Sequence, residues 1–396
     1  IEPNVCVLDP IRFTPDEIGF LLTRGGDKHA EAAFWNQFEH ADTFGSLIQP
    51  DVDLTTRLKE HIAQLDDGGD VLLADVLDWA ERVTEQAEYL TSRSHVVVTN
   101  PPYMGNRNMS DFLRTIGETL YPTAKADLCT MFIQRCLGLV APLGLVAIIA
   151  SESWLFNSTF EELRLMTSRA ARLLVAACID SSAFGIRLNT AASIFQLQGN
   201  LVDSLFFRIG PGDLQPNPPP ALPVAGAPVH RVSLDSFAFL PGSAYVFDLP
   251  PALIALYAGN PTIGQAVDLK VGLQTGSNSR FLRFWWEVSV SRIAFDCGGR
   301  AEAKRTGRRW FPYNKGGTPV PWWGTQDHVV NWEDDGSEVR AFGTAEGGRP
   351  RSRAQNTDYY FRPSITWSNI GRGGAWFRAL PAGYVFDVAG MSAFPK

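Results

Sequence analysis

The chain has 396 residues, of which 45% are hydrophobic and 19% are charged. This composition excludes a collagen, a disordered tail and a disulfide-rich scaffold, and the length favours two or three domains with buried cores. The five cysteines are scattered and form no CxxC pair, which suits a reducing compartment and argues against a zinc site. The longest apolar run, residues 137–150, is shorter than the about 20 residues that a membrane span needs.

The net charge of −7 conceals an asymmetry along the chain. Residues 270–315 hold ten basic and three acidic side chains, so this segment carries +7 and the remainder −14. A basic segment in an otherwise acidic protein is the distribution expected where one face meets phosphate groups. A solvated basic surface would give the same composition, so charge alone leaves both interpretations open.

In chain order, a short apolar run at 5–8 predicts a strand, and apolar residues at helical spacing predict helices over 46–58 and 70–90. The β-branched run 95–99 predicts a strand that must end at the two prolines after it. One helix and three strands are then expected, over 127–140, 145–150, 173–180 and 191–197. Apolar strands separated by helices predict an α/β fold, with a mostly parallel sheet and helices on both faces.

A change of composition divides the chain. Seven prolines lie between Pro211 and Pro228, which predicts a stiff linker or exposed loop over 211–228. Residues 229–396 show few helical patterns and many aromatic residues and turns, as in a β-rich module. We therefore expect an α/β domain over 1–210, the linker, and a second, incomplete domain over 229–396.

The motif Asn100-Pro101-Pro102-Tyr103 directly follows the strand at 95–99, where open α/β sheets place ligands. The side-chain oxygen of Asn100 and the backbone carbonyl of Pro101 could accept both hydrogens of an exocyclic amine such as adenine N6, freeing its lone pair. The prolines hold these acceptors in advance, and Tyr103 offers a flat face for a base flipped out of the duplex. The alternative interpretation is a rigid turn with Tyr103 in the core.

This motif resembles the catalytic motif of the amino-group DNA methyltransferases, which use S-adenosylmethionine. Residues 126–132 and 142–155 resemble the helix and strand that follow the motif in γ-class adenine enzymes. Residues 184–194 resemble the stretch whose leading aromatic residue, here Phe184, packs against the flipped adenine. Further strings narrow the resemblance to the BREX phage-defence methyltransferases of the PglX type; they lie at 100–105, 269–276, 280–283, 310–317, 331–336 and 359–368.

The resemblance implies a Rossmann-like methyltransferase sheet and a target-recognition domain. The implied activity is methylation of adenine N6 in double-stranded DNA in the bacterial cytoplasm, with other BREX defence proteins as partners and no membrane. The implied catalytic residues are Asn100, Pro101, Pro102 and Tyr103, with Tyr103 and Phe184 stacking on the adenine. Asn100 would also lie at the edge of the cofactor pocket.

The glycine-rich cofactor turn of this family is absent, because Asp9-Pro10 is not followed by glycines. The sequence opens at Ile1 without a signal-peptide pattern, and we expect it to be a fragment whose cofactor motif lies upstream. Alone, the chain should bind S-adenosylmethionine poorly or not at all and should be inactive.

The second module is then the candidate for target recognition, with a basic stripe for phosphates and turns for base edges. The DNA-contact candidates are Gln274, Asn278, Arg280, Arg283, Lys304, Arg305, Arg308, Arg309 and Lys315. No metal site is expected, because His95, His230 and His328 are isolated and the acidic run 333–335 is interpreted as a loop.

Two alternatives to DNA methylation stay open. The same motif serves methylation of RNA bases and of glutamine amides in proteins, so the acceptor is not fixed by the motif. The chain could also be a DNA-recognition or assembly fragment without catalysis of its own.

Overall fold

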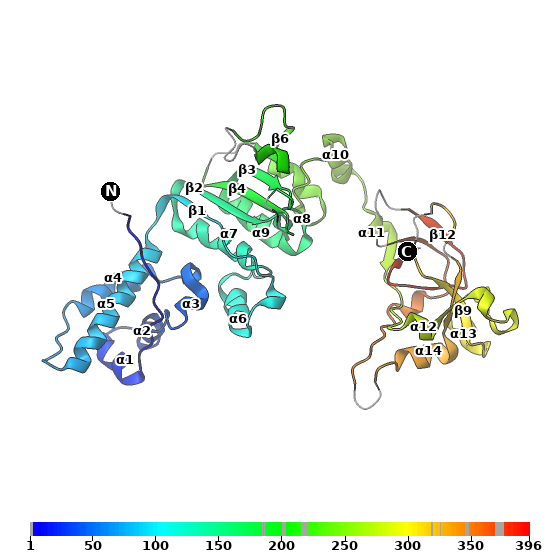
Figure 1. Cartoon of the computed structure of the whole chain (residues 1–396), viewed down its shortest axis with the longest axis horizontal. Coiled ribbons are helices and arrows are strands. Elements are labelled where there is room, and N and C mark those ends of the chain that lie inside the picture. Colours follow the sequence, from blue (N-terminus) through cyan, green and yellow to red (C-terminus); the bar gives the residue numbers. More distant parts are fainter. Residues whose placement is uncertain are drawn as a thin grey trace. The chain divides into compact units, whose positions relative to one another are not determined.

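A computed structural model of the chain describes residues 3–183, 185, 187–199, 203–214, 221–317, 320–324, 326–344, 348–368 and 376–396. The chain divides into two compact units, unit 1 over residues 1–258 and unit 2 over residues 259–396 (Figure 1). No helix among the described residues is long and apolar enough to cross a membrane.

Unit 1 begins with an extended segment and a group of helices. The helices are α1 (Pro15–Leu21), α2 (Lys28–Trp35), α3 (Ala41–Phe44), α4 (Val52–Ile62) and α5 (Val71–Thr91). Aspartates at 27, 51 and 70 accept backbone hydrogen bonds at the starts of α2, α4 and α5, which fixes where these helices begin. The helix predicted at 70–90 is confirmed as α5, and the one predicted at 46–58 is found as α4 at Val52–Ile62, shifted toward the carboxyl end.

The strand predicted at 5–8 is wrong. Residues 3–14 form neither helix nor strand, and Val5 and Val7 are 74% and 65% exposed. The segment is held through Asp9, whose carboxylate pairs with Arg82 of α5 at 2.7 Å. An apolar run without a neighbouring strand has no ladder to join, so its pattern alone did not produce a strand.

The centre of unit 1 is a six-stranded sheet in the order β1-β2-β4-β3-β5-β6. Its strands are β1 (Ser94–Thr99), β2 (Val140–Ser151), β3 (Ala171–Ile179), β4 (Thr190–Leu197), β5 (Ser204–Ile209) and β6 (Val229–Val232). The pairs β1–β2 and β3–β5 are parallel, and the other three pairs are antiparallel. The sheet is therefore mixed rather than mostly parallel, because the loop between β3 and β4 is too short for a parallel crossover.

Helices cover one face of this sheet. The helices after β1 are α6 (Asp111–Leu120), α7 (Leu128–Leu139), α8 (Ser153–Phe156), α9 (Glu161–Ala170) and α10 (Pro251–Gly259). Helix α7 packs on β1 and β2 and α9 packs on β3, within one large core (Figure 1). On the opposite face, Val96 and Val98 of β1 are 57% and 74% exposed. The α/β fold is confirmed, but the expected helical cover of both faces is not found in the described residues.

The domain boundary lies later in the chain than the proline-rich segment. Strand β6 pairs with β5, and Tyr245 donates a backbone hydrogen bond to Leu155 at 2.8 Å. The buried guanidinium of Arg164 donates to the carbonyl of Ser243 at 3.1 Å. Residues 229–258 therefore belong to unit 1, and the boundary falls between Ala258 and Gly259 rather than within 211–228.

Unit 2 is β-rich, with two four-stranded sheets ordered β13-β9-β10-β8 and β12-β11-β14-β7. The strands are β7 (Val267–Lys270), β8 (Leu282–Phe284), β9 (Trp310–Asn314), β10 (His328–Asn331), β11 (Ser364–Ser368), β12 (Arg378–Leu380), β13 (Val385–Phe386) and β14 (Gly390–Pro395). The helices are α11 (Ile263–Ala266), α12 (Asn278–Phe281), α13 (Arg300–Arg305) and α14 (Glu333–Arg340). Leu282, Phe311 and Val330 meet in register on one face and form the centre of its core.

Candidate active site

The motif Asn100–Tyr103 lies at one edge of the unit 1 sheet. Strands β1, β2, β3 and β5 run in the same direction, so the residues that follow their carboxyl ends share this edge. These residues include Asn100 after β1, Glu152 after β2 and Asp180 after β3. Ligands of open α/β sheets bind at such an edge, which is where the sequence placed the motif.

Within the motif, the Tyr103 hydroxyl donates a hydrogen bond to Asn100 Oδ1 at 2.9 Å. Asn100 and Pro102 are exposed, whereas Pro101 is buried and Tyr103 is half-buried. No described residue donates a hydrogen bond to the Pro101 carbonyl. The structure thus leaves the Pro101 carbonyl and the second lone pair of Asn100 Oδ1 available as acceptors.

Burial, together with the nearby Cys129 and Asp127, raises the pKa of the Tyr103 phenol. The phenol therefore stays protonated at neutral pH and keeps donating to Asn100. This hydrogen bond orients the Asn100 amide, a role for Tyr103 that the sequence did not suggest.

The loop after the motif is fastened to the start of α7 by Asp127. Its Oδ1 accepts hydrogen bonds from the backbone of Cys129 at 3.0 Å and of Met104 at 3.3 Å. Two backbone hydrogen bonds, Leu128 to Met104 and Asn106 to Ala126, run alongside at 2.9 and 3.0 Å. Sequence reasoning missed this function of Asp127, although an aspartate before a helical run is a typical N-cap signal.

A charged group stands elsewhere on the same edge. Arg208 of β5 is half-exposed and pairs with Glu152 at 3.0 Å and with Asp248 at 3.1 Å. The backbone N–H of Glu152 donates to Asn189 at 3.0 Å, which ties the end of β2 to the loop before β4. Phe184, the residue assigned to stack on the adenine, is in that loop and lies outside the described residues.

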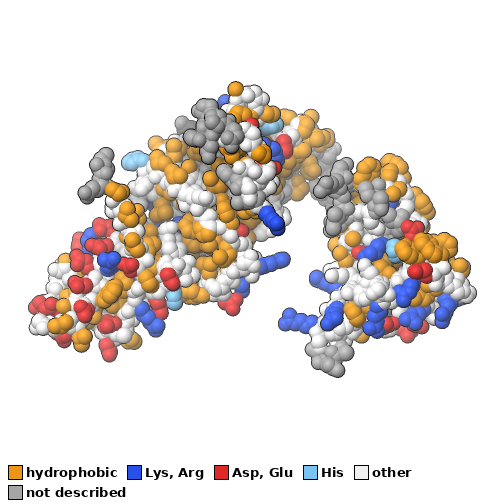
Figure 2. Space-filling model, in the orientation of Figure 1, with side chains coloured by type: hydrophobic (Ala, Val, Ile, Leu, Met, Phe, Trp, Pro, Cys, Tyr) orange, Lys and Arg blue, Asp and Glu red, His pale blue; other side chains and the backbone are white. Residues whose placement is uncertain are grey.

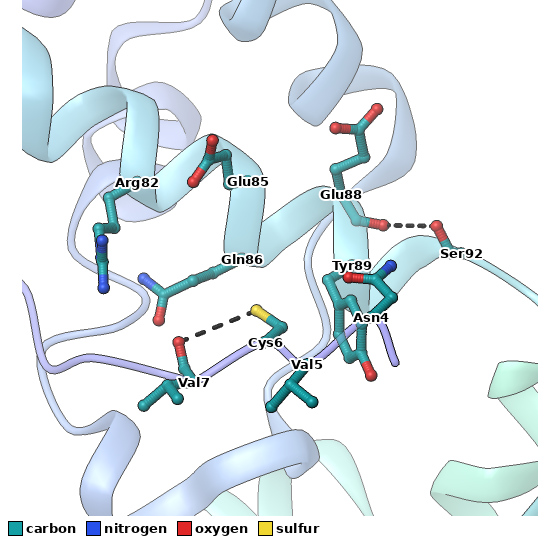
Figure 3. Close-up of a pocket in the computed structure, with 10 residues that line it drawn as sticks. All are labelled: Asn4, Val5, Cys6, Val7, Arg82, Glu85, Gln86, Glu88, Tyr89 and Ser92. Carbon is teal, nitrogen blue, oxygen red and sulfur yellow. Dashed lines mark hydrogen bonds between the residues drawn. The ribbon is translucent and has the colours of Figure 1, made fainter. Parts of the chain in front are cut away.

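Two cavities flank helix α5. One, of about 530 Å³, lies between residues 4–7 and the polar side chains of Arg82, Glu85 and Glu88 (Figure 3). The other, of about 760 Å³, is lined by several acids, among them Asp75 and Asp78. Neither is lined by a residue of the Asn100–Tyr103 motif, and no glycine-rich turn lines either of them. The residues that line these two cavities therefore do not form a site for S-adenosylmethionine.

The sheet edge beside the motif is open. Strand β1 is terminal in the strand order, and among the described residues it pairs with β2 alone. A terminal strand with unpaired backbone groups and exposed valines is a site where a further strand can be added. The structure thus places an open strand edge next to the candidate catalytic residues.

Several of the predicted DNA-contact residues form ion pairs within unit 2. Arg280 donates to Glu338 at 2.9 and 3.0 Å, and Arg309 approaches the same carboxylate at 3.5 Å. Lys315 pairs with the buried Asp387 at 2.9 Å. The charges of these cations are therefore largely neutralised within the unit. The basic segment thus offers fewer unpaired positive charges than its composition indicated.

The remaining candidates are exposed, except for Arg283. Arg283 is half-buried and donates to backbone carbonyls of Ser279 and Leu282, whereas Gln274 and Asn278 are exposed polar residues. The exposed cations Lys304, Arg305 and Arg308 form no ion pair with any described residue. They lie at and just after the end of α13, and basic side chains are prominent on the face of unit 2 in Figure 2.

The acidic run 333–335 is engaged with arginines. Arg300 pairs with Asp335. Burial would raise the pKa of the Asp335 carboxyl, but the hydrogen bonds and positive charge of Arg300 outweigh it and lower that pKa. Arg309 lies 4.0 Å from Glu333. Among the described residues, no group of three His, Cys, Asp or Glu side chains is arranged to hold a metal ion.

Comparison with known proteins finds a family match and two relatives that resemble this chain. Residues 36–177 match the family of Eco57I restriction-modification methylases. The adenine-specific methyltransferase BrxX of Escherichia coli O9:H4 (strain HS) is 30% identical over 367 residues, covering 90% of this chain and 29% of the relative. The adenine-specific methyltransferase PglX of Lacticaseibacillus casei (strain Zhang) is 32% identical over 319 residues, covering 77% and 26%.

The chain therefore spans less than a third of the length of these two relatives. The structure of the Type IIL restriction-modification enzyme MmeI in complex with DNA is 10% identical, with a TM-score of 0.45, over 92% of this chain and 60% of that one. The resemblance drawn from the sequence motifs is confirmed by the two curated relatives and the family match.

Proposed function

We propose that this chain, which is homologous over most of its length to part of the adenine-specific methyltransferases BrxX and PglX, methylates adenine N6 in double-stranded DNA. It would do so as the modification component of a BREX phage-defence system. The observation that carries the proposal is the pair of available oxygens, Asn100 Oδ1 and the Pro101 carbonyl, at the carboxyl edge of the sheet.

The proposed chemistry follows from these acceptors. The N6 amine of adenine is a weak nucleophile because its lone pair is delocalised into the ring. Hydrogen bonds from its two hydrogens to Asn100 and Pro101 would hold the nitrogen in place and localise that pair for attack. Tyr103 would keep the Asn100 oxygen oriented, because its hydroxyl occupies one lone pair of that oxygen and leaves the other. The methylated nitrogen then loses one of its protons to water, so no residue of the motif has to change its protonation.

The cofactor implied by the family is S-adenosylmethionine, which supplies an electrophilic methyl group when bound. Since the residues present do not form its site, we infer that a glycine-rich portion of the same protein completes it. The open edge of β1, with Val96 and Val98 exposed beside it, is the surface that such a portion would cover. The same reasoning favours an inactive chain when that portion is absent.

Unit 2 is proposed to hold the DNA. Its unpaired cations Lys304, Arg305 and Arg308 are the phosphate contacts that the structure favours. Replacing Arg305 and Arg308 by glutamine should weaken duplex binding at all sequences and reduce the slope of log K against log salt by about 2. An unchanged slope would place the phosphates elsewhere.

The acceptor and the need for catalysis can be tested together. Purified full-length protein that contains this chain is incubated with methyl-labelled S-adenosylmethionine and with duplex DNA, RNA or protein as acceptor. Label is expected in adenine N6 of duplex DNA and should disappear in Asn100→Ala, while duplex binding stays within about twofold. Label found only in RNA or only in protein would show that DNA is not the acceptor. Methyl transfer by the Asn100→Ala variant would show that the motif has a structural role and not a catalytic one.

A further inference from the structure

Unit 2 contains a small cavity with aromatic walls, separate from the basic residues described above. Its volume is about 320 Å³. Pro312 of β9 and Val329 of β10, which are partners in the strand register, line it from the sheet. Trp285 and Phe295 line it from the segment between β8 and α13 and are 44% and 47% exposed, and Tyr384 completes the aromatic lining. Such exposed aromatic surface around a cavity marks an interaction site.

Two polar side chains also line the cavity. Gln326 Oε1 accepts a hydrogen bond from the Tyr384 hydroxyl at 3.0 Å, whereas the buried Gln326 Nε2 has no partner among the described residues. A buried amide donor without a partner calls for an acceptor from a ligand or water. Burial lowers the pKa of His328, so its imidazole is neutral at pH 7 and adds no positive charge.

Asp296 and Asp327 adjoin lining residues of this cavity in the sequence, and Glu287 lies two residues from Trp285. The nearby cations are engaged elsewhere: Arg283 donates to backbone carbonyls, and Lys315, whose charge acts on His328, pairs with Asp387. Glu287, Asp296 and Asp327 are exposed and form no ion pair with any described residue. Burial is the main cause of the raised pKa of Tyr384, and the negative charges of Asp296 and Asp327 raise it further. Both carboxylates therefore act electrostatically on this residue of the cavity lining. A phosphate group brought here would be repelled, and a cation would be attracted.

We propose that this cavity binds the cationic side chain of a protein partner, an arginine or a lysine. A guanidinium or ammonium group over the faces of Trp285, Phe295 and Tyr384 gains cation–π attraction, and the surrounding carboxylates add charge complementarity. A nucleobase would also fit aromatic walls, but its phosphates would lie beside three unpaired carboxylates. This inference concerns a protein-docking role and does not depend on the methylation proposed above.

The test uses three capped peptides, acetyl-Gly-Arg-Gly-amide, its lysine analogue and its glutamine analogue. Binding to the whole chain is followed by NMR through the indole N–H of Trp285, which Trp285→Phe identifies. The arginine and lysine peptides should shift this signal to saturation, and the glutamine peptide should not. An equal response to all three would overturn the proposal, and so would a shift produced by duplex DNA alone.

Charge variants make the test specific. The double variant Asp296→Asn and Asp327→Asn should weaken binding of the cationic peptides at least about threefold, because two carboxylates are neutralised. Asp334→Asn is the matched control, since Asp334 is an exposed acid outside the cavity lining, and it should leave binding unchanged. Equal binding by the double variant and the wild type would refute the electrostatic basis of the proposal.

Discussion

Replacement of Asp127 by alanine should loosen the catalytic loop without unfolding unit 1. The substitution removes the N-cap hydrogen bond to Cys129 and the hydrogen bond to Met104. A lost cap costs about 1 kcal/mol and a lost hydrogen bond to a carboxylate about as much, so local stability should fall by about 2 kcal/mol. Asp127→Asn keeps an acceptor oxygen at a favoured cap position and should lose much less.

Hydrogen exchange followed by mass spectrometry measures this change locally, in a peptide that spans the loop and the start of α7. Two kcal/mol corresponds to exchange that is about 30-fold faster in the alanine variant, while peptides from unit 2 stay unchanged. Methyl transfer should fall in parallel with little change in duplex affinity, because the loop carries the acceptors and not the DNA contacts. Normal exchange in Asp127→Ala, or equal damage in Asp127→Asn, would refute this role of the carboxylate.

Three further substitutions probe other parts of the structure. Tyr103→Phe removes the donor that orients Asn100, and kcat should fall about tenfold with duplex affinity unchanged; a normal kcat would show that the hydrogen bond is dispensable. Lys315→Gln removes the positive charge that pairs with the buried Asp387 carboxylate. The unfolding free energy of unit 2, measured by urea titration, should fall by about 2 kcal/mol. Normal stability together with a smaller salt dependence of DNA binding would instead show that Lys315 contacts a phosphate. Burial raises the pKa of Tyr121 to about 12 from its ordinary 10, so its contribution to stability is complete below pH 10 and is lost as the pH rises to 12. Urea titrations at pH 9 and 11 should therefore show a smaller alkaline loss for Tyr121→Phe than for the wild type, and an equal loss would contradict this assignment.

The sequence by itself determined the local features of the site. A β-branched run followed by two prolines can only be a strand that stops, so the end of β1 and the rigid position of Asn100 follow from residues 95–103. Helix α7 was equally readable, because its apolar residues recur at helical spacing within one stretch. The α/β class of unit 1 and the β-rich nature of unit 2 came from the same local patterns.

Only the tertiary structure decided what depends on residues far apart in the chain. The sheet contains both parallel and antiparallel pairs because β4 inserts between β2 and β3. The sequence of an apolar strand does not indicate which strands it will pair with. The pairing of Lys315 with Asp387 joins residues 72 positions apart, which a count of charges along the sequence cannot reveal. For the same reason, the sequence assigned β6 to the second domain, whereas its pairing with β5 shows that it belongs to unit 1.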